Sequence, residues 1–234
     1  MKPRNIVLEG ITGSKAYGLD TATSDTDVKG VYLLPTRDVL SLGFDPQHTT
    51  IDNTNPDWVY HEVGKFMKLV MGGNPTVTEL LFLEDYTVIT PIGQLLINNR
   101  DYFLSTKGVQ KAYRGYALGQ AKDLAKRFAE GKEGYDSSLK NRYAKHTRHC
   151  FRLLLQARQL LETGTLVVKV TPEQREYLFD MGTKPVDFVV DEFMRQDKLL
   201  EDVQSVLPDL PNTDELNALL YTIRMQNIAE TGDF

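Results

Sequence analysis

Two aspartates one residue apart follow a Gly-Ser pair near the start of the chain. In the stretch "TGSKAYGLDTATSDTDVKGVYLLP", residues 12–35, Gly13 and Ser14 come first and Asp25 and Asp27 follow. Two anions this close repel each other, so the pattern requires either solvent or a cation. Mg²⁺ binds one or two carboxylates together with phosphate oxygens of a substrate. We therefore predict that Asp25 and Asp27 bind Mg²⁺ or Mn²⁺, and two such ions suit transfer from a nucleoside triphosphate such as ATP.

The Gly-Ser pair has the chemistry of a phosphate site. Gly13 lets a phosphate approach the backbone, Ser14 adds a hydroxyl donor, and the short helix expected after them offers free N–H groups at its start. We predict that both residues bind the phosphates of a nucleotide. For Asp25 and Asp27, the alternative interpretation is that "SDTD" at 24–27 is only a polar turn before a strand.

The elements that position these residues change in character near residue 90. Apolar, β-rich runs at 5–11, 26–35 and 57–63 favour strands. Side chains two apart on a strand share a face, so Asp25 and Asp27 are expected to point the same way. After residue 90 most segments are typical of helices. The predicted fold is α+β, with a small mixed β-sheet and flanking helices in a catalytic core (1–90). A helical domain (91–234) then closes the cleft.

The opening stretch resembles the DNA polymerase beta-type nucleotidyltransferase superfamily. The signature there is a hydrophobic residue, Gly-Gly or Gly-Ser, a spacer, and Asp-x-Asp on a strand. The chain is similar in particular to the predicted nucleotidyltransferase group that includes the RNA ligase-associated members. The matching motifs run through most of the chain, and they are "GSKAYG", "SDTDVKG", Asp57, "KF" at 65–66, "GNP" at 73–75, "ELLF" at 79–82, Lys145, His149 and Arg152.

The resemblance implies a third carboxylate and a function. Asp57, which opens "DWVYHEV", is the expected third metal ligand; Glu79 and Glu62 are the alternatives. The implied activity is transfer of a nucleoside monophosphate from a nucleoside triphosphate to an acceptor hydroxyl with release of pyrophosphate. An RNA 3′ end, as in RNA repair, is the expected acceptor. Protein nucleotidylation and a non-catalytic nucleotide- or RNA-binding module remain open alternatives.

A basic helix carries the remaining candidates. At helical spacing Lys145, His149 and Arg152 share one stripe with Arg142, and the resemblance supports their contact with nucleotide phosphates. The alternative is a solvated or interdomain face. For Tyr17 the sequence leaves two roles open, stacking on a base or packing under the turn.

Charge and composition indicate the partners and the compartment. Residues 107–152 carry 12 Lys and Arg against four Asp and Glu within a 234-residue chain of net charge −5, which favours a polyanion such as RNA. The one cysteine excludes an internal disulfide framework, and the histidines lack the spacing of a zinc site. No membrane-length apolar run and no signal-peptide pattern occur, so the cytoplasm, or host cytoplasm for a viral protein, is the expected location.

Overall fold

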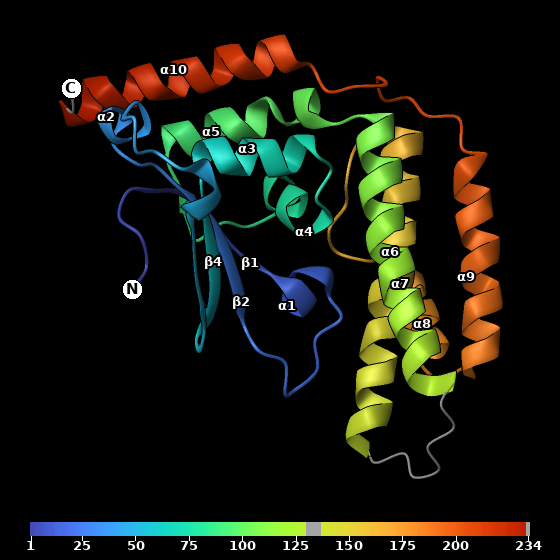
Figure 1. The fold of residues 1–234 in the computed structure, drawn as a ribbon. Coiled ribbons are helices and arrows are strands. Elements are labelled where there is room, and N and C mark those ends of the chain that lie inside the picture. Colours follow the sequence, from blue (N-terminus) through green and yellow to red (C-terminus); the bar gives the residue numbers. More distant parts are fainter. Residues whose placement is uncertain (130–136, 233–234) are drawn as a thin grey trace.

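The computed structural model describes residues 1–129 and 137–232 and places a five-stranded sheet beside a group of long helices (Figure 1). The strands are β1 (Ile6–Thr12), β2 (Asp27–Tyr32), β3 (Thr50–Thr54), β4 (Asp57–Glu62) and β5 (Val88–Ile89). The helices and 3₁₀ turns are α1 (Gly13–Tyr17), α2 (Thr36–Val39), η1 (Pro46–His48), α3 (Val63–Met71), α4 (Pro75–Thr78), η2 (Glu79–Phe82), α5 (Pro91–Asn98), η3 (Arg100–Phe103), α6 (Thr106–Ala129), α7 (Ser137–Thr163), α8 (Pro172–Met181), α9 (Val186–Glu201) and α10 (Thr213–Thr231). The predicted α+β class is confirmed.

The sheet is mixed, with strand order β3-β4-β2-β1-β5. β2 and β4 run parallel and all other neighbours run antiparallel. The three strands expected from the sequence are present, and the structure adds β3 and β5. These two lack the apolar alternation that identifies a strand, since β3 reads "TIDNT" and β5 has two residues.

Each face of the sheet has its own apolar cluster. The main core joins the sheet to the helices and includes Phe66 of α3, which has no exposed surface. A smaller cluster on the other face consists of Tyr32, Trp58 and Tyr60. Gly30 leaves space for the Tyr60 ring of this cluster, because a Cβ atom at position 30 would lie 2.5 Å from that ring, which is too close. Trp58 and Phe66 are thus core residues that hold β2 and β4 in place.

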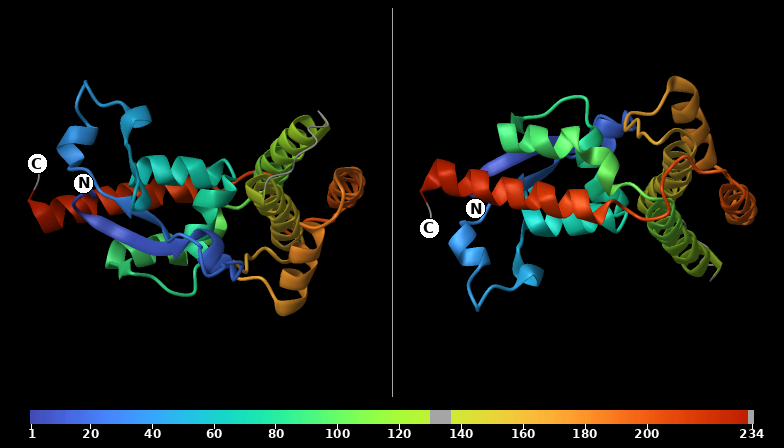
Figure 2. Two further views of the ribbon diagram at one scale, coloured as in Figure 1. Left: turned by 90° about the horizontal axis from the view of Figure 1, so that it is seen from below. Right: turned by 90° about the horizontal axis from the view of Figure 1, so that it is seen from above.

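The helices after residue 90 do not all pack together. α6 and α7 form a long antiparallel pair with α8 and α9 against it, whereas α5 and α10 lie over the sheet unit (Figures 1 and 2). α10 is held there by Arg224, whose Nη2 lies 2.6 Å from Oε1 of the buried Glu62. The boundary at residue 90 stays a prediction. None of the described helices has the length and apolar character to cross a membrane.

Candidate active site

Asp27 and Asp57 start neighbouring parallel strands. Val28 of β2 pairs with Trp58 of β4, so the two aspartates, each one residue earlier, lie side by side at the same edge of the sheet. Neighbouring strands are about 4.8 Å apart. β2 begins at Asp27, so Asp25 lies in the preceding loop with its side chain exposed. The expectation that Asp25 lies on that strand is therefore wrong, because the turn in which the Ser24 amide donates to the Thr21 carbonyl delays the strand.

Gly13 brings the start of α1 against Asp27. A Cβ atom at Gly13 would lie 1.8 Å from Oδ2 of Asp27, and the backbone has φ +67°. Only glycine satisfies both conditions, the positive φ and the close contact. No side chain caps the start of α1. The start of α1, with the backbone N–H groups of Gly13 and Ser14, therefore lies beside the Asp27 carboxylate.

The Asp27 carboxylate lies between like and opposite charges. Burial raises its pKa most, and the charge of Asp57 and a hydrogen bond with it act in the same direction. Lys145 of α7 and Lys29 of β2 lower that pKa. Lys145 therefore brings a positive charge from α7 close to the Asp27 carboxylate.

The donor set at this edge fits a divalent cation. Two adjacent carboxylates raise the energy of each other's charged form, and a cation between them removes that repulsion. Among the described residues, no group of three or more His, Cys, Asp or Glu side chains is arranged to hold a metal. Asp27 and Asp57 would offer a cation two protein carboxylates, with the other positions left to substrate oxygens and water. That arrangement is the one Mg²⁺ favours.

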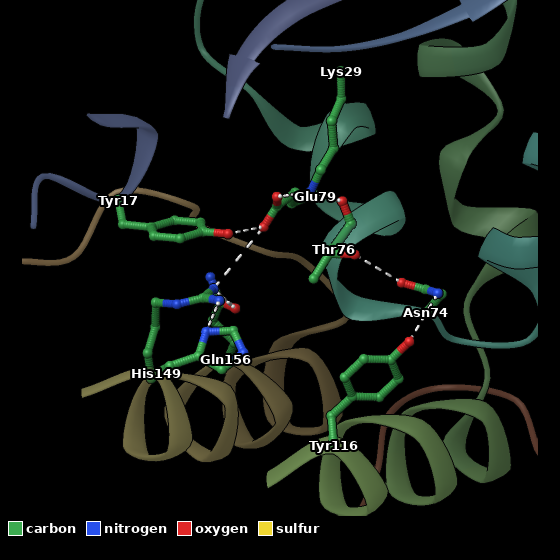
Figure 3. Close-up of polar contacts among 9 residues, drawn as sticks. Tyr17, Lys29, Asn74, Thr76, Glu79, Tyr116, His149 and Gln156 are labelled. Atoms are coloured by element: carbon green, nitrogen blue, oxygen red, sulfur yellow. Dashed lines mark hydrogen bonds and ion pairs between the residues drawn. The ribbon is translucent and has the colours of Figure 1, made fainter. Parts of the chain in front are cut away.

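Glu79 belongs to a different cluster, which joins α1, β2 and α7 (Figure 3). Its side chain is 1% exposed. Its Oε2 accepts a hydrogen bond from the Tyr17 hydroxyl at 2.7 Å, and its Oε1 lies 2.9 Å from Nζ of Lys29. Nη1 of Arg152 is 4.0 Å from Oε2. With these partners, Glu79 connects elements of the fold, and Glu62 lies at the opposite end of β4 bound to Arg224.

The predicted basic stripe on α7 passes from solvent into the core. Lys145 is exposed, His149 is half-buried and Arg152 is 1% exposed. The Arg152 guanidinium stacks 3.6 Å from the Tyr17 ring centroid and donates to Gln156 at 2.6 Å. Tyr17 therefore packs under the turn and does not stack on a base. Lys145 is the member of the stripe that faces Asp27.

His149 is held as a neutral imidazole. Burial, and then the charge of Arg152, lower its pKa to about 3. Nη2 of Arg152 lies 3.2 Å from Nδ1 of His149, and an arginine can only donate, so Nδ1 is the acceptor. The proton is therefore on Nε2, which makes that nitrogen a hydrogen-bond donor.

A second link between the sheet unit and the helices was not anticipated from the sequence. Nζ of Lys29 donates to the Thr76 carbonyl at 2.5 Å, and the Thr76 hydroxyl donates to Oδ1 of Asn74 at 3.1 Å. Asn74 in turn donates to the Tyr116 hydroxyl of α6 at 3.2 Å (Figure 3). The signal in the sequence is Lys29 itself, because it shares a strand face with Asp27.

Comparison with known proteins gives one family and two individual matches. The model of the RNA repair pathway DNA polymerase beta family (RlaP) matches residues 2–182. An uncharacterized 38.9 kDa protein of Enterobacteria phage T4, from the nrdC-mobD intergenic region, is 28% identical over 127 residues. That match spans 49% of this chain and 37% of the phage protein. The crystal structure of a nucleotidyltransferase-like protein from Exiguobacterium sibiricum shares 11% identity at a TM-score of 0.36, over 84% of this chain and 69% of that one.

Proposed function

The chain belongs to the RNA repair pathway DNA polymerase beta family, a nucleotidyltransferase-like family, and from this premise we propose that it is a metal-dependent nucleotidyltransferase. It moves a nucleoside monophosphate from a nucleoside triphosphate to an acceptor hydroxyl, with release of pyrophosphate. The acceptor is an RNA 3′ end.

One observation carries this proposal. The start of α1 at Gly13 touches the Asp27 carboxylate and has no side-chain cap, and Asp57 lies beside Asp27 on the neighbouring strand. A phosphate held at that helix start is therefore next to two carboxylates suited to a divalent cation. Phosphoryl transfer from a triphosphate needs these two elements together.

The chain's own residues have separate tasks. Gly13 and Ser14 donate N–H and O–H groups to the triphosphate. Asp27 and Asp57 hold the divalent cations; Asp25 of the preceding loop remains a proposed further ligand. When bound, the cations stabilise charge on the attacking and leaving oxygens. The acceptor hydroxyl loses its proton during attack, and we assign the exposed carboxylate of Asp57 to accept it.

Helix α7 supplies further groups that face the carboxylate pair. Lys145 faces Asp27 and offers a cation to the phosphates. The Nε2–H of His149 can donate to a phosphate oxygen without adding charge. Arg152 is buried against Glu79 and Tyr17, so we assign it to positioning His149.

RNA is favoured as acceptor by charge and by the family. Lys140, Arg142 and Lys145 are exposed along α7 and extend from the carboxylate pair. Other predicted basic residues, at 123–139, lie among side chains outside the described part of the chain. The family that matches is described as an RNA repair family.

The test is nucleotidyl transfer from α-labelled nucleoside triphosphates in the presence of Mg²⁺ or Mn²⁺. Total RNA and protein are supplied together, and products are separated by mass. We expect label on RNA and a loss of about a hundredfold or more in Asp27→Asn and Asp57→Asn, since metal stabilisation of the transition state is worth several kcal/mol. Asp38→Asn, an exposed carboxylate of α2, is the control and should retain activity. Full activity in both site variants rejects the proposal, and label on protein instead of RNA rejects the acceptor.

A further inference from the structure

Two guanidinium groups from different helices lie over one aromatic ring. Cζ of Arg148, on α7, is 4.6 Å from the centroid of the Phe179 ring, and Cζ of Arg175, on α8, is 4.4 Å from it. Cation–π contact with one ring brings two like charges together. Such an arrangement is stable only where an anion or solvent screens the charges.

These arginines have no ion-pair partner among the described residues. Neither Arg148 nor Arg175 forms an ion pair with a described residue, and the charge of Arg175, after burial, lowers the pKa of Arg148. Two other arginines of the helical part have acidic partners. Arg114 pairs with Asp197 and Glu201, and Arg158 pairs with Glu162. The pair over Phe179 therefore has unused capacity for an anion.

The pair is held in a fixed position beside the candidate active site. Nε of Arg175 donates to the Gly18 carbonyl, at the end of α1, at 3.0 Å. Gly13, at the start of α1, touches Asp27, and a helix of five residues spans about 7 Å. On α7, Arg148 lies one turn after Lys145, the residue that faces Asp27.

A pocket lies beside α1 and is lined in part by Lys15 and Ala16 of that helix and by Glu84 and Asp85. It has a volume of about 320 Å³, which is the lower range of ligand pockets. Lys169 lines this pocket and also packs beside Gly18, because a Cβ atom at Gly18 would lie 3.4 Å from its Cγ. Lys169 and Arg175 therefore both lie at Gly18, the end of α1 away from Asp27.

We propose that Arg148 and Arg175 bind a backbone phosphate of the acceptor RNA, upstream of the 3′ end that lies at Asp27 and Asp57. A planar guanidinium fork binds two phosphate oxygens at once, and stacking on Phe179 holds both forks ready for binding. The start of α1 already serves the triphosphate, and the pair is at its other end. This inference rests on the proposed function for the identity of the ligand.

The test is binding of a short single-stranded RNA, labelled at its 5′ end, to the full chain without nucleoside triphosphate. Fluorescence anisotropy is measured over a range of salt concentrations. We expect Arg148→Gln and Arg175→Gln each to weaken binding about tenfold and to reduce the slope of log K against log salt by about 0.7, the value for one phosphate contact of a single strand. Arg158→Gln, on α7 but paired with Glu162, is the matched control and should change neither.

Two further measurements keep the inference falsifiable. Arg175→Lys keeps the charge and removes the fork, so it should retain the salt slope and still lose affinity. Inorganic tripolyphosphate, followed by calorimetry, should bind the wild type and both Gln variants equally. Unchanged RNA affinity and salt slope in the Gln variants would overturn the inference. A loss of affinity for tripolyphosphate alone would also overturn it, since the pair would then bind the triphosphate. Because these assays need no turnover, an inactive chain whose RNA binding depends on the pair refutes the proposed function and retains this inference.

Discussion

Replacing Glu79 by alanine should destabilise the protein far more than replacing any exposed carboxylate. The change removes the one anion shared by Tyr17, Lys29 and Arg152. Arg152 and Glu79 are both 1% exposed, so the guanidinium would stay buried with no carboxylate. Unit charges 4.0 Å apart interact by about 4 kcal/mol at the effective dielectric constant of about 20 that describes protein sites.

The expected loss in the free energy of unfolding is about 3–5 kcal/mol. That is the usual effect of removing one partner from a buried pair, and the Tyr17 hydroxyl, left without an acceptor, adds to it. Urea denaturation followed by circular dichroism measures the loss as a shift in midpoint at constant slope. Glu162→Ala is the control, because Glu162 pairs with Arg158 at 2.7 Å but both side chains are about half exposed; its loss should be below about 1 kcal/mol.

A double mutant separates the ion pair from general packing. Arg152→Met on the Glu79→Gln background removes both buried charges while keeping side chains of similar length. It should recover stability relative to Glu79→Gln alone, because no uncompensated charge remains near that position except Lys29, which is 20% exposed. The reasoning is refuted if Glu79→Ala costs no more than the Glu162→Ala control, or if the double mutant is as unstable as the sum of the singles.

Two further predictions concern Gly13 and His149. Gly13→Ala places a Cβ atom 1.8 Å from Oδ2 of Asp27 at φ +67°, so it should cost about 1–2 kcal/mol in stability and about a hundredfold in nucleotidyl transfer; equal transfer by the variant and the wild type would contradict this. His149 has a pKa of about 3 in the folded chain against 6.5 in the unfolded chain, so the unfolded state binds the extra proton first. Its contribution to stability is complete above pH 6.5 and falls by about 1.4 kcal/mol per pH unit as the pH drops towards 3. His149→Gln should flatten the dependence of the urea midpoint on pH between 7 and 5, whereas His48→Gln, an exposed control, should not; the same slope in both variants would show that His149 is not the group responsible.

The sequence predicts the elements of this site better than their partners. Asp27 and Asp57 each open a run with strand periodicity, so their place at strand starts follows from local pattern. The fact that the two aspartates lie side by side does not follow from local pattern. It results from the parallel pairing of β4 with β2, although β3 lies between these two strands in the chain. The resemblance to a known family supplied Asp57 as the third carboxylate, but no local rule sets the register of distant strands.

The position of Arg152 shows why the basic stripe was only partly predictable. Helical spacing correctly places it on the same side of α7 as Lys145, but spacing carries no information on depth. Its burial depends on Tyr17 of α1 and Glu79 of η2, which are remote in the chain. A buried charge requires such partners, and they become visible only when the fold is known.

The buried cluster around Glu79 explains how two separate units can form one site. The carboxylate pair belongs to the sheet, whereas Lys145 and His149 belong to α7, and the transfer that we propose requires that their distance be fixed. Glu79 contacts α1 through Tyr17, β2 through Lys29 and α7 through Arg152, so a shift of any of these elements would separate buried charges. An apolar contact would tolerate small slides between the units, because dispersion has no preferred direction. The same cluster fixes the tautomer of His149 through Arg152, so its Nε2–H is a donor that joins Lys145 in the phosphate contact that we propose.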